Sequence, residues 1–504
     1  MTTTYRYALA TVLLMQAAAA PAHAQPAEPA AKSNDTAAAR VAPVPPSAAE
    51  LKQRFDDLLG RPGGLTASEA GKRARATSPL VRAKSARIAA AEYDATQAKL
   101  GYFPRVSLTA RYARLSPVDA GSLGSGDGSL VVTPAPAGPI APGTPLFAAP
   151  ASLFTFPVIL DSYTLAASLA VPLSDIPLRV VHAQRAAGHA EKAASVDRKA
   201  IERSQVTNAK LSYFDWVRRS LQEVVAAESV AQAEEALRVT RALEEAGRAS
   251  PADVLQGEAQ LAGAKLMRER ARHGVEAAMK RLRAMMHDDA KTPYAIGEDP
   301  TSEFTPPAVA SLDELYAEAL TQRPELEGLE RQGDALDEQR RVVSAGNWPR
   351  LDAFANFTLA NPNQRVFPQV DEFRGTWDLG VQLTYSPNDT ASSLTSTGVL
   401  AAKREELAAQ AAALADAIKD EVREAELALR EATLALDTTA TGLAAAEEGY
   451  RVRLERFRLG SATALEMSET NVTLLRSRLD RIDAQLGQRM AALRLVHALG
   501  RGVD

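Results

Sequence analysis

The side chains that could do chemistry in this chain of 504 residues are few: there are six histidines and no cysteine. His182 and His189 are seven residues apart and would share one face of a helix, where two imidazoles could ligate a metal ion. We interpret them as paired or exposed side chains rather than as a metal site. The lack of cysteine excludes disulfides, thiolate metal sites and a lipid attached through an N-terminal cysteine.

Other catalytic patterns are also missing. The run Gly124-Ser125-Gly126-Asp127-Gly128 lacks a lysine and a flanking strand and helix, so we interpret it as a flexible loop rather than a phosphate-binding loop. There is no nucleophile elbow and no metalloprotease helix. We therefore expect a protein that is not an enzyme, with no catalytic residue, metal or cofactor. A formal net charge of −4 gives no sign of a basic surface for nucleic acid.

Two carboxylates stand where a helix is expected to begin. Asp253 lies three residues after Ser250, which precedes a proline, and Glu466 lies three residues after Thr463. A Ser or Thr followed at this distance by an acidic residue is the pattern of a capping box, in which each side chain bonds to the other residue's backbone N–H. Both carboxylates are therefore expected to cap helices.

The N-terminus has the pattern of an export signal. Arg6 precedes an uncharged run from Tyr7 to Ala20, and Ala22-His23-Ala24 forms a small-residue cleavage site. We predict a signal peptide at residues 1–24; an uncleaved anchor is the alternative, although the run is too short to span a membrane. Residues 25–67 are rich in Ala and Pro and are predicted to form a disordered leader. No later stretch has the pattern of a transmembrane helix, so the exported chain is either soluble or enters a membrane as strands.

Long helices dominate the rest of the chain. Residues 391–460 contain no proline and place apolar or small side chains at heptad steps, as at Leu407, Ala411, Leu414 and Ile418. A helix of this length would measure about 105 Å and needs neighbours of similar length. It is expected to be one wall of a coiled-coil assembly.

The sequence also repeats. Ser78-Pro79 corresponds to Arg323-Pro324, and Phe103-Pro104 to Trp348-Pro349, both at an interval of 245 residues. Each copy reads as short helix, strand, loop, strand, long helix and shorter helix, so we predict two structural repeats, at 68–307 and 308–504. Strands are expected at about 104–115, 161–173, 350–360 and 375–386, and the later helices at about 178–246, 251–287, 391–459 and 463–499. Two short helices placed end to end would match one long helix in length.

The four strands alternate apolar and polar side chains, and only Phe354 departs from the pattern. Four strands cannot close a barrel, and the open edges are not tolerated in hydrocarbon, so copies would have to share one: eight strands in a dimer or twelve in a trimer. A β-layer in a soluble helical protein is the alternative. The apolar faces carry an expected aromatic girdle, Tyr112, Tyr163, Phe357, Trp377 and Tyr385. The polar faces carry expected lumen residues, Arg105, Arg111, Asp352, Asp378 and Gln382.

In these features the chain resembles the TolC family of outer-membrane efflux proteins. The resemblance spans about Ser68 to Gly500 and rests on the duplicated unit, the aromatic-Pro pairs before strands, and the helix turns that start at Gly247 and Gly460. It implies a mostly α fold with a small β part: a long antiparallel coiled-coil α-barrel, plus four transmembrane strands per chain that complete a 12-stranded β-barrel in a homotrimer. It also implies a tunnel through the periplasm that is closed at its far tip.

The resemblance implies a gate at the two helix turns. Its acidic positions match Asp253, Glu466 and Glu469. Family members often hold the tip shut with a tyrosine and an arginine, whereas the matching positions here are Phe457 and Ala462. The closing contact in this chain is therefore expected to be weaker or to use other groups, such as Arg456 or Arg458.

The implied function is that of an exit duct in the cell outer membrane, for an efflux or type I secretion system. Its implied partners are outer-membrane lipid, a periplasmic adaptor and an inner-membrane pump of the RND, ABC or MFS type. A soluble periplasmic coiled-coil adaptor or scaffold is the alternative. Drug, metal ion, siderophore and secreted polypeptide stay open as cargoes, and the loop from Leu115 to Leu160 could fold over the mouth or dip inside.

Overall fold

The computed structural model describes residues 48–118, 129–132, 139, 142–143, 145, 147–150, 158–289, 294–302, 304–306, 311–459 and 461–502. The predicted signal peptide and the glycine-rich run at 124–128 lie outside these residues. The elements are α1 (Ala48–Leu58), α2 (Ala67–Thr77), α3 (Pro79–Leu100), β1 (Arg105–Arg114), β2 (Ser129–Val132), β3 (Phe147–Pro150), β4 (Asp161–Pro172), the π-helix η2 (Ile176–Val180), α4 (Val181–Glu245), α5 (Pro251–Met286), α6 (Leu312–Gln322), α7 (Pro324–Ser344), the 3₁₀ helix η3 (Ala345–Asn347), β5 (Arg350–Asn361), β6 (Arg374–Thr384), α8 (Pro387–Arg458) and α9 (Ala464–Ala498).

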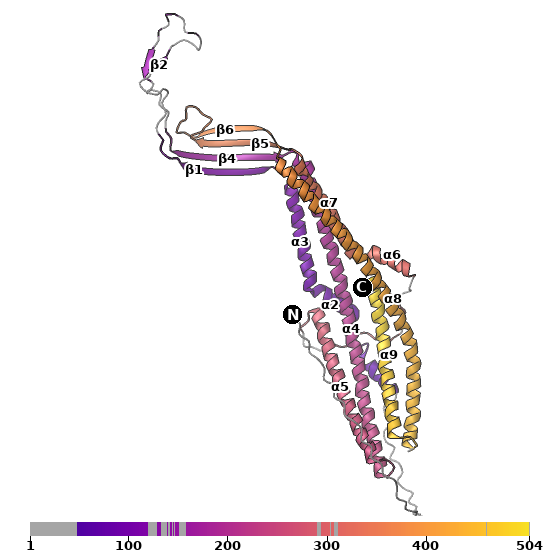
Figure 1. Ribbon diagram of the computed structural model, residues 1–504. Coiled ribbons are helices and arrows are strands. Elements are labelled where there is room, and N and C mark those ends of the chain that lie inside the picture. The colour runs from indigo at the N-terminus through magenta and orange to yellow at the C-terminus, as the bar shows by residue number, and fades with distance from the viewer. Residues whose placement is uncertain are drawn as a thin grey trace, which may run out of the picture. The chain divides into compact units, whose positions relative to one another are not determined.

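Strands β1, β4, β5 and β6 form one antiparallel sheet in the order β1-β4-β5-β6. Each begins and ends within two residues of the range expected from the sequence. Because α3 leads into β1 and α7 into β5, while α4 follows β4 and α8 follows β6, all four strands meet the helices at the same end of the sheet (Figure 1). Strands β2 and β3 form a separate hairpin inside the segment that was expected to be only a loop.

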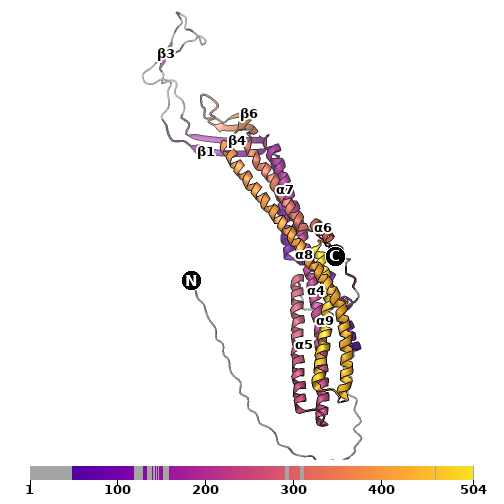
Figure 2. The same cartoon turned by 45° about the vertical axis from the view of Figure 1, so that its right-hand side comes forward.

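The helices pack as predicted from their lengths. α3 and α5 both pack along α4, and α7 and α9 both pack along α8 and α4, so two shorter helices stand beside each long one (Figures 1 and 2). α8 has 72 residues, and such a helix is about 108 Å long. Among the described helices, none is long and apolar enough to cross a membrane.

The helix starts follow the caps found in the sequence. Ser250 and Thr463 each form a capping box, with Asp253 and Glu466 respectively, and this confirms the predicted capping role of both carboxylates. The long helix α8 starts four residues earlier than expected, at Pro387. A proline fits the first helical position because its missing N–H would have no partner there.

The predicted disordered leader is wrong for its last part. α1 is a helix, and Leu51, Leu59 and Leu65 are buried. Leu65 also forms a parallel β-bridge with Ile296, in the linker between the repeats. The Ala/Pro-rich composition of the leader does not extend into α1, whose Ala, Glu, Leu, Lys, Gln and Arg residues favour a helix. Burial of its apolar side chains against α4 stabilises that helix.

The largest core lies where α2, α4, α5 and α9 come together. It includes Leu221 of α4, Leu282 of α5 and Leu486 of α9, each with no measurable exposure. A second core joins α6, α8 and α9 and includes Ile418 and Leu429 of the predicted heptad. The middle of the helical layer is thereby fixed, whereas the strands and the helix turns extend away from these cores.

Candidate functional site

The register of the sheet separates an apolar face from a polar one. Residues directly opposite each other in an antiparallel pair lie on the same face. Tyr112 is opposite Tyr163, and Phe357 is opposite both Ala167 and Trp377. These aromatic side chains therefore share one face across all four strands, together with the leucines and valines of the alternating pattern. Tyr385 follows β6 by one residue and is exposed.

Aromatic side chains lie near both ends of the strands. At the end away from the helices, the rings of Tyr112 and Tyr163 are 5.0 Å apart, and those of Tyr163 and Phe373 are 6.0 Å apart. At the helix end, Trp348 and Phe103 are exposed beside the first residues of β5 and β1. Phe373, Trp348 and Phe103 were missed as girdle candidates because they lie just outside the alternating runs.

The opposite face is polar. Arg105, Arg111, Asp352, Asp378 and Gln382 lie on it, and Asp352 is directly opposite Gln382. Asp378 accepts a hydrogen bond of 2.9 Å from the side-chain amide of Asn356.

Phe354 also lies on the polar face, where it broke the alternation of the sequence. It stands opposite Gly380, and a Cβ added there would come within 2.9 Å of the phenyl ring. The ring therefore covers a glycine, and this explains the exception.

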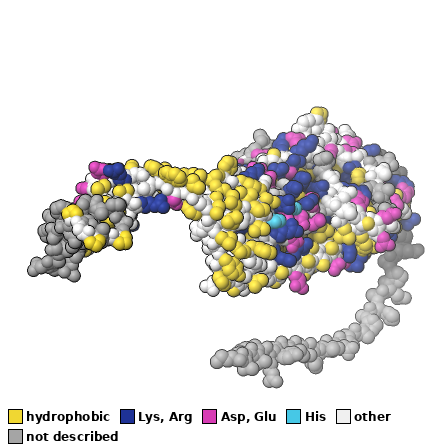
Figure 3. Space-filling model, turned by 90° about the horizontal axis from the view of Figure 1, so that it is seen from above, with side chains coloured by type: hydrophobic (Ala, Val, Ile, Leu, Met, Phe, Trp, Pro, Cys, Tyr) yellow, Lys and Arg dark blue, Asp and Glu magenta, His cyan; other side chains and the backbone are white. Residues whose placement is uncertain are grey.

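Hydrophobic side chains gather along the sheet and where the strands join the helices, whereas charged side chains gather over the helices farther from it (Figure 3). Leu108, Leu379 and Val381 of the apolar face are each more than two-thirds exposed in the single chain. A surface with such exposed apolar groups needs an apolar environment.

The conformation of the turn between α4 and α5 is fixed by a glycine and by a helix cap. Gly247 has φ of 69°, a conformation that favours glycine. Asp253 accepts hydrogen bonds from the Ser250 backbone N–H at 2.9 Å and from the Ser250 hydroxyl at 2.7 Å. These bonds lower the pKa of the Asp253 carboxyl below its ordinary value.

The turn between α8 and α9 has a similar cap and an additional ion pair. Glu466 accepts a hydrogen bond of 2.8 Å from the Thr463 backbone N–H, and its other oxygen lies 2.9 Å from an Arg453 nitrogen on α8. The backbone bond and the nearby guanidinium lower the pKa of Glu466. Thirteen residues separate the two charged groups, so sequence patterns of helix faces could not pair them.

A further contact joins the two turns. A guanidinium nitrogen of Arg248 donates a hydrogen bond of 3.0 Å to the Leu459 carbonyl oxygen. Of the remaining gate candidates, Phe457 is buried, with 3% of its surface exposed, and Arg456, Arg458 and Glu469 are exposed. Asp253 and Glu466 thus lie at two neighbouring turns, and Arg456 and Arg458 lie at the end of α8 beside the second turn. The contacts at these turns are made by Arg248 and Arg453, which the sequence did not single out.

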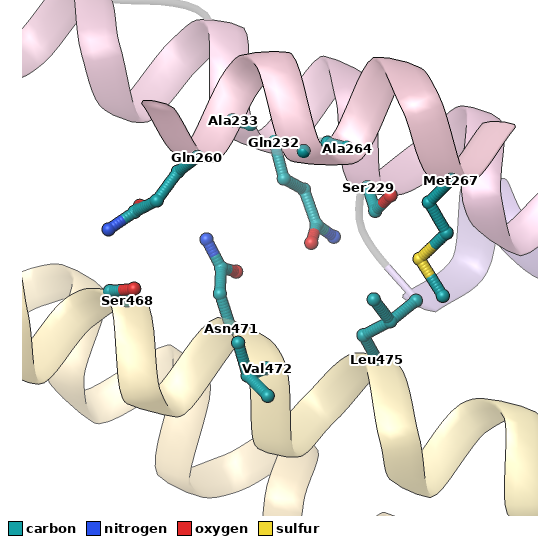
Figure 4. Close-up of a pocket in the computed structure, with 11 residues that line it drawn as sticks. Ser229, Gln232, Ala233, Gln260, Ala264, Met267, Ser468, Asn471, Val472 and Leu475 are labelled. Carbon is teal, nitrogen blue, oxygen red and sulfur yellow. The ribbon is translucent and has the colours of Figure 1, made fainter. Parts of the chain in front are cut away.

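A groove runs between α5 and α9, with α4 as its floor. Near the turns it includes a cavity of about 240 Å³. Figure 4 shows Asn471 and Ser468 of α9 facing Gln260 of α5, with Gln232 of α4 beside Asn471. Farther from the turns the groove continues into a hollow of about 530 Å³ lined by charged side chains such as Arg270 and Asp480.

The two histidines of the heptad pair are both placed against carboxylates of α7. His182 Nδ1 is 2.5 Å from Glu338 Oε2, and His189 Nδ1 is 3.4 Å from Asp334 Oδ2. This agrees with their interpretation as paired side chains. In the described part of the chain, no three acidic or histidine side chains are grouped so that they could hold a metal ion.

Comparison with known proteins places these features in context. A family model described as "Outer membrane efflux protein" matches residues 70–286 and 315–501, one segment in each repeat. No curated protein sequence matches the chain.

Solved structures share the fold. The CmeC outer membrane channel of Campylobacter jejuni superimposes with a TM-score of 0.68 at 15% identity, over 89% of this chain and 87% of that one. VceC of Vibrio cholerae, an outer membrane protein, gives a TM-score of 0.65 at 16% identity, with coverage of 91% and 100%. The MtrE outer membrane channel of Neisseria gonorrhoeae in its open state gives 0.64 at 16% identity, with coverage of 87% and 89%.

Proposed function

The chain belongs to the outer membrane efflux protein family, and from this premise we propose how it works. Three copies assemble into one passive duct in the outer membrane. An inner-membrane pump and a periplasmic adaptor deliver substrates to its periplasmic end. The sheet carries this proposal, because it has one apolar face, one polar face and two open edges.

The open edges of the sheet require further strands. Among the strands that the structure describes, β1 and β6 each pair on only one side. In hydrocarbon every backbone N–H and C=O needs a partner within the protein, so β6 of one copy pairs with β1 of the next. Four strands from each of three chains give 4 × 3 = 12 strands. The apolar face, with aromatic rings near both ends, then contacts lipid, and the polar face lines the lumen.

The helical layer has matching open sides. α8 and α3 lie at its two outer sides, because α8 packs within the chain on α6, α7 and α9, and α3 on α2 and α4. Exposed apolar side chains occur on both, among them Leu394 and Leu434 of α8 and Tyr93 of α3. Contact between α8 of one copy and α3 and α5 of the next would bury such groups and close the tunnel wall.

The turns at the far end of the helices serve as the gate. Asp253, Glu466 and Glu469 would place acidic groups around the tip in three copies, and the contacts of Arg248 and Arg453 hold the turns together. Capping and gating are compatible, because a capping carboxylate keeps one oxygen available at the surface. The Glu466–Arg453 pair shows such a second use within one chain.

The groove between α5 and α9 is the proposed docking surface for the adaptor. The segment of the adaptor that docks there would be an α-helical hairpin. A helix fits because the groove is bounded by two helices over a third. Its lining is small or uncharged near the turns and charged farther away, so an approaching helix would need small apolar residues at its tip and charged residues behind them.

Two measurements test the function. The mature protein should fractionate with outer membranes, need detergent for extraction, and give discrete single-channel conductance steps in a planar bilayer. Quantitative recovery of the protein in the detergent-free soluble fraction, without conductance after reconstitution, would instead favour a soluble adaptor.

A further inference from the structure

The loop between β5 and β6 is tightly organised by polar contacts. The Asn361 side-chain amide donates to Asp371 Oδ1 at 2.9 Å, and the Asn363 amide donates to the Arg374 carbonyl oxygen at 2.8 Å. The Arg365 backbone N–H in turn donates to Asn363 Oδ1 at 3.0 Å. Asn361 and Asn363 are both buried, at 8% and 4% exposure. Buried amides that form hydrogen bonds restrict the conformations open to a loop at the end of a sheet.

The contacts of this loop fix the face on which it lies. The Asn363 amide also donates to the Thr376 hydroxyl at 3.2 Å, and an Arg365 guanidinium nitrogen lies 3.8 Å from Asp378 Oδ1. The same nitrogen donates to the Trp377 carbonyl oxygen at 3.1 Å. The side chains of Thr376 and Asp378 both point to the polar face. Asn363 and Arg365 therefore lie over the polar face. The loop that carries them is at the end of the strands away from the helices (Figure 1).

The other arm of the loop lies on the apolar face. Phe373, directly before β6, has its ring 6.0 Å from that of Tyr163. The loop thus contacts both faces of the sheet at its end. The aromatic arm would sit at the lipid interface, and the arginine arm would sit over the lumen.

We propose that this loop folds inward and constricts the outer mouth, and that the ion pair between Arg365 and Asp378 holds it there. The inference rests on the proposed function, because the polar face is a lumen only in the closed barrel. In the trimer, three such loops project over one opening and present three guanidinium groups. They would limit the size of what passes between the outside and the lumen.

Cysteine labelling tests this directly, because the chain has no cysteine of its own. Gln382→Cys places a single thiol on the polar face near the helix end of β6. Intact cells would be treated from outside with a small membrane-impermeant maleimide and with a polyethylene-glycol maleimide. The labelling rate is compared between the unchanged loop, Arg365→Ala and a shortened loop in which Asn-Gly replaces residues 363–372.

Arg374→Ala is the matched control. Arg374 is also at the loop, but its guanidinium pairs with Glu372 within 2.8 Å, and both groups are exposed. We expect the large reagent to label several-fold faster in Arg365→Ala and in the shortened loop, and at an unchanged rate in Arg374→Ala. The small reagent should label all variants equally fast.

Two results distinguish the possible failures. If shortening the loop leaves the rate of the large reagent unchanged while the small reagent reacts, the constriction does not exist and the inference is overturned. If neither reagent reaches the thiol even in the shortened loop, the polar face is not a lumen and the proposed function is itself wrong.

Discussion

Removal of one hydroxyl at the proposed gate provides a quantitative prediction. In Ser250→Ala, the Asp253 N–H loses one of its two acceptors, the Ser250 Oγ at 3.3 Å, and keeps the Ser250 carbonyl oxygen at 3.0 Å. Asp253 Oδ2 loses the hydroxyl donor at 2.7 Å. The bond from the backbone N–H of residue 250 to Asp253 can persist. Loss of a serine N-cap costs about 1 kcal/mol. If that cost falls on local opening of the first turn of α5, the equilibrium between opened and closed turn shifts about fivefold towards the open form.

The chain offers a control with the same chemistry at another place. Ser311 caps α6 through a capping box with Glu314, whose carboxylate accepts from the Ser311 N–H at 3.0 Å. Ser311→Ala should therefore loosen the first turn of α6 to a similar extent. It should leave the channel closed, because α6 packs on α8 and on the second core, away from the turns.

Hydrogen exchange and conductance together provide the assay. Amide exchange at residues 252–254 should accelerate about fivefold in Ser250→Ala, and the fraction of time that single channels spend open should rise. Ser311→Ala should accelerate exchange only at the start of α6. Equal conductance changes in both variants, or faster exchange at the turn without any change in channel opening, would refute the gate assignment.

Three further predictions follow from burial, titration and packing. Leu282→Ala should lower the free energy of unfolding by about 2–5 kcal/mol in denaturant titrations because the side chain is fully buried, whereas Leu266→Ala, at a half-exposed leucine of the same helix, should change it far less. Asp253 and Glu466 have lowered pKa values, so their contributions to stability hold above the ordinary values of 3.8 and 4.5 and are lost as the pH falls through the lowered ones. The protection of the amides at both turns, measured as the exchange rate relative to the intrinsic rate at each pH, should therefore fall at acid pH, and Asp253→Asn should remove that dependence at its own turn. Gly297→Ala should lower the melting temperature, since its Cβ would overlap a backbone carbonyl of the segment before α2.

The sequence predicts regular elements well where a local rule governs them. Alternation located the four main strands, and the serine and threonine caps located the starts of α5 and α9. The polar and apolar faces also follow from alternation, since the period of two in each strand survives in the register. Phe354 is the exception to this alternation, and it is explained only by Gly380, which lies opposite it on β6.

Contacts between distant segments could not be predicted. Arg453 pairs with Glu466 across a helix turn, Arg248 bonds to Leu459 in the other repeat, and Arg365 reaches Asp378 across a folded loop. None of these pairs has a characteristic spacing, because the geometry of two packed helices or of a folded loop decides them. α1 is a different case, because its own residues favour a helix and only the Ala/Pro-rich composition of the preceding residues indicated disorder.

The number of chains in the detergent-extracted particle tests the central claim most directly. Native mass spectrometry of the mature protein should give three chains per particle. This trimer should dissociate only on heating. A single chain that is folded, monodisperse and stable without detergent would contradict the account, since its sheet would then need no partner at either edge.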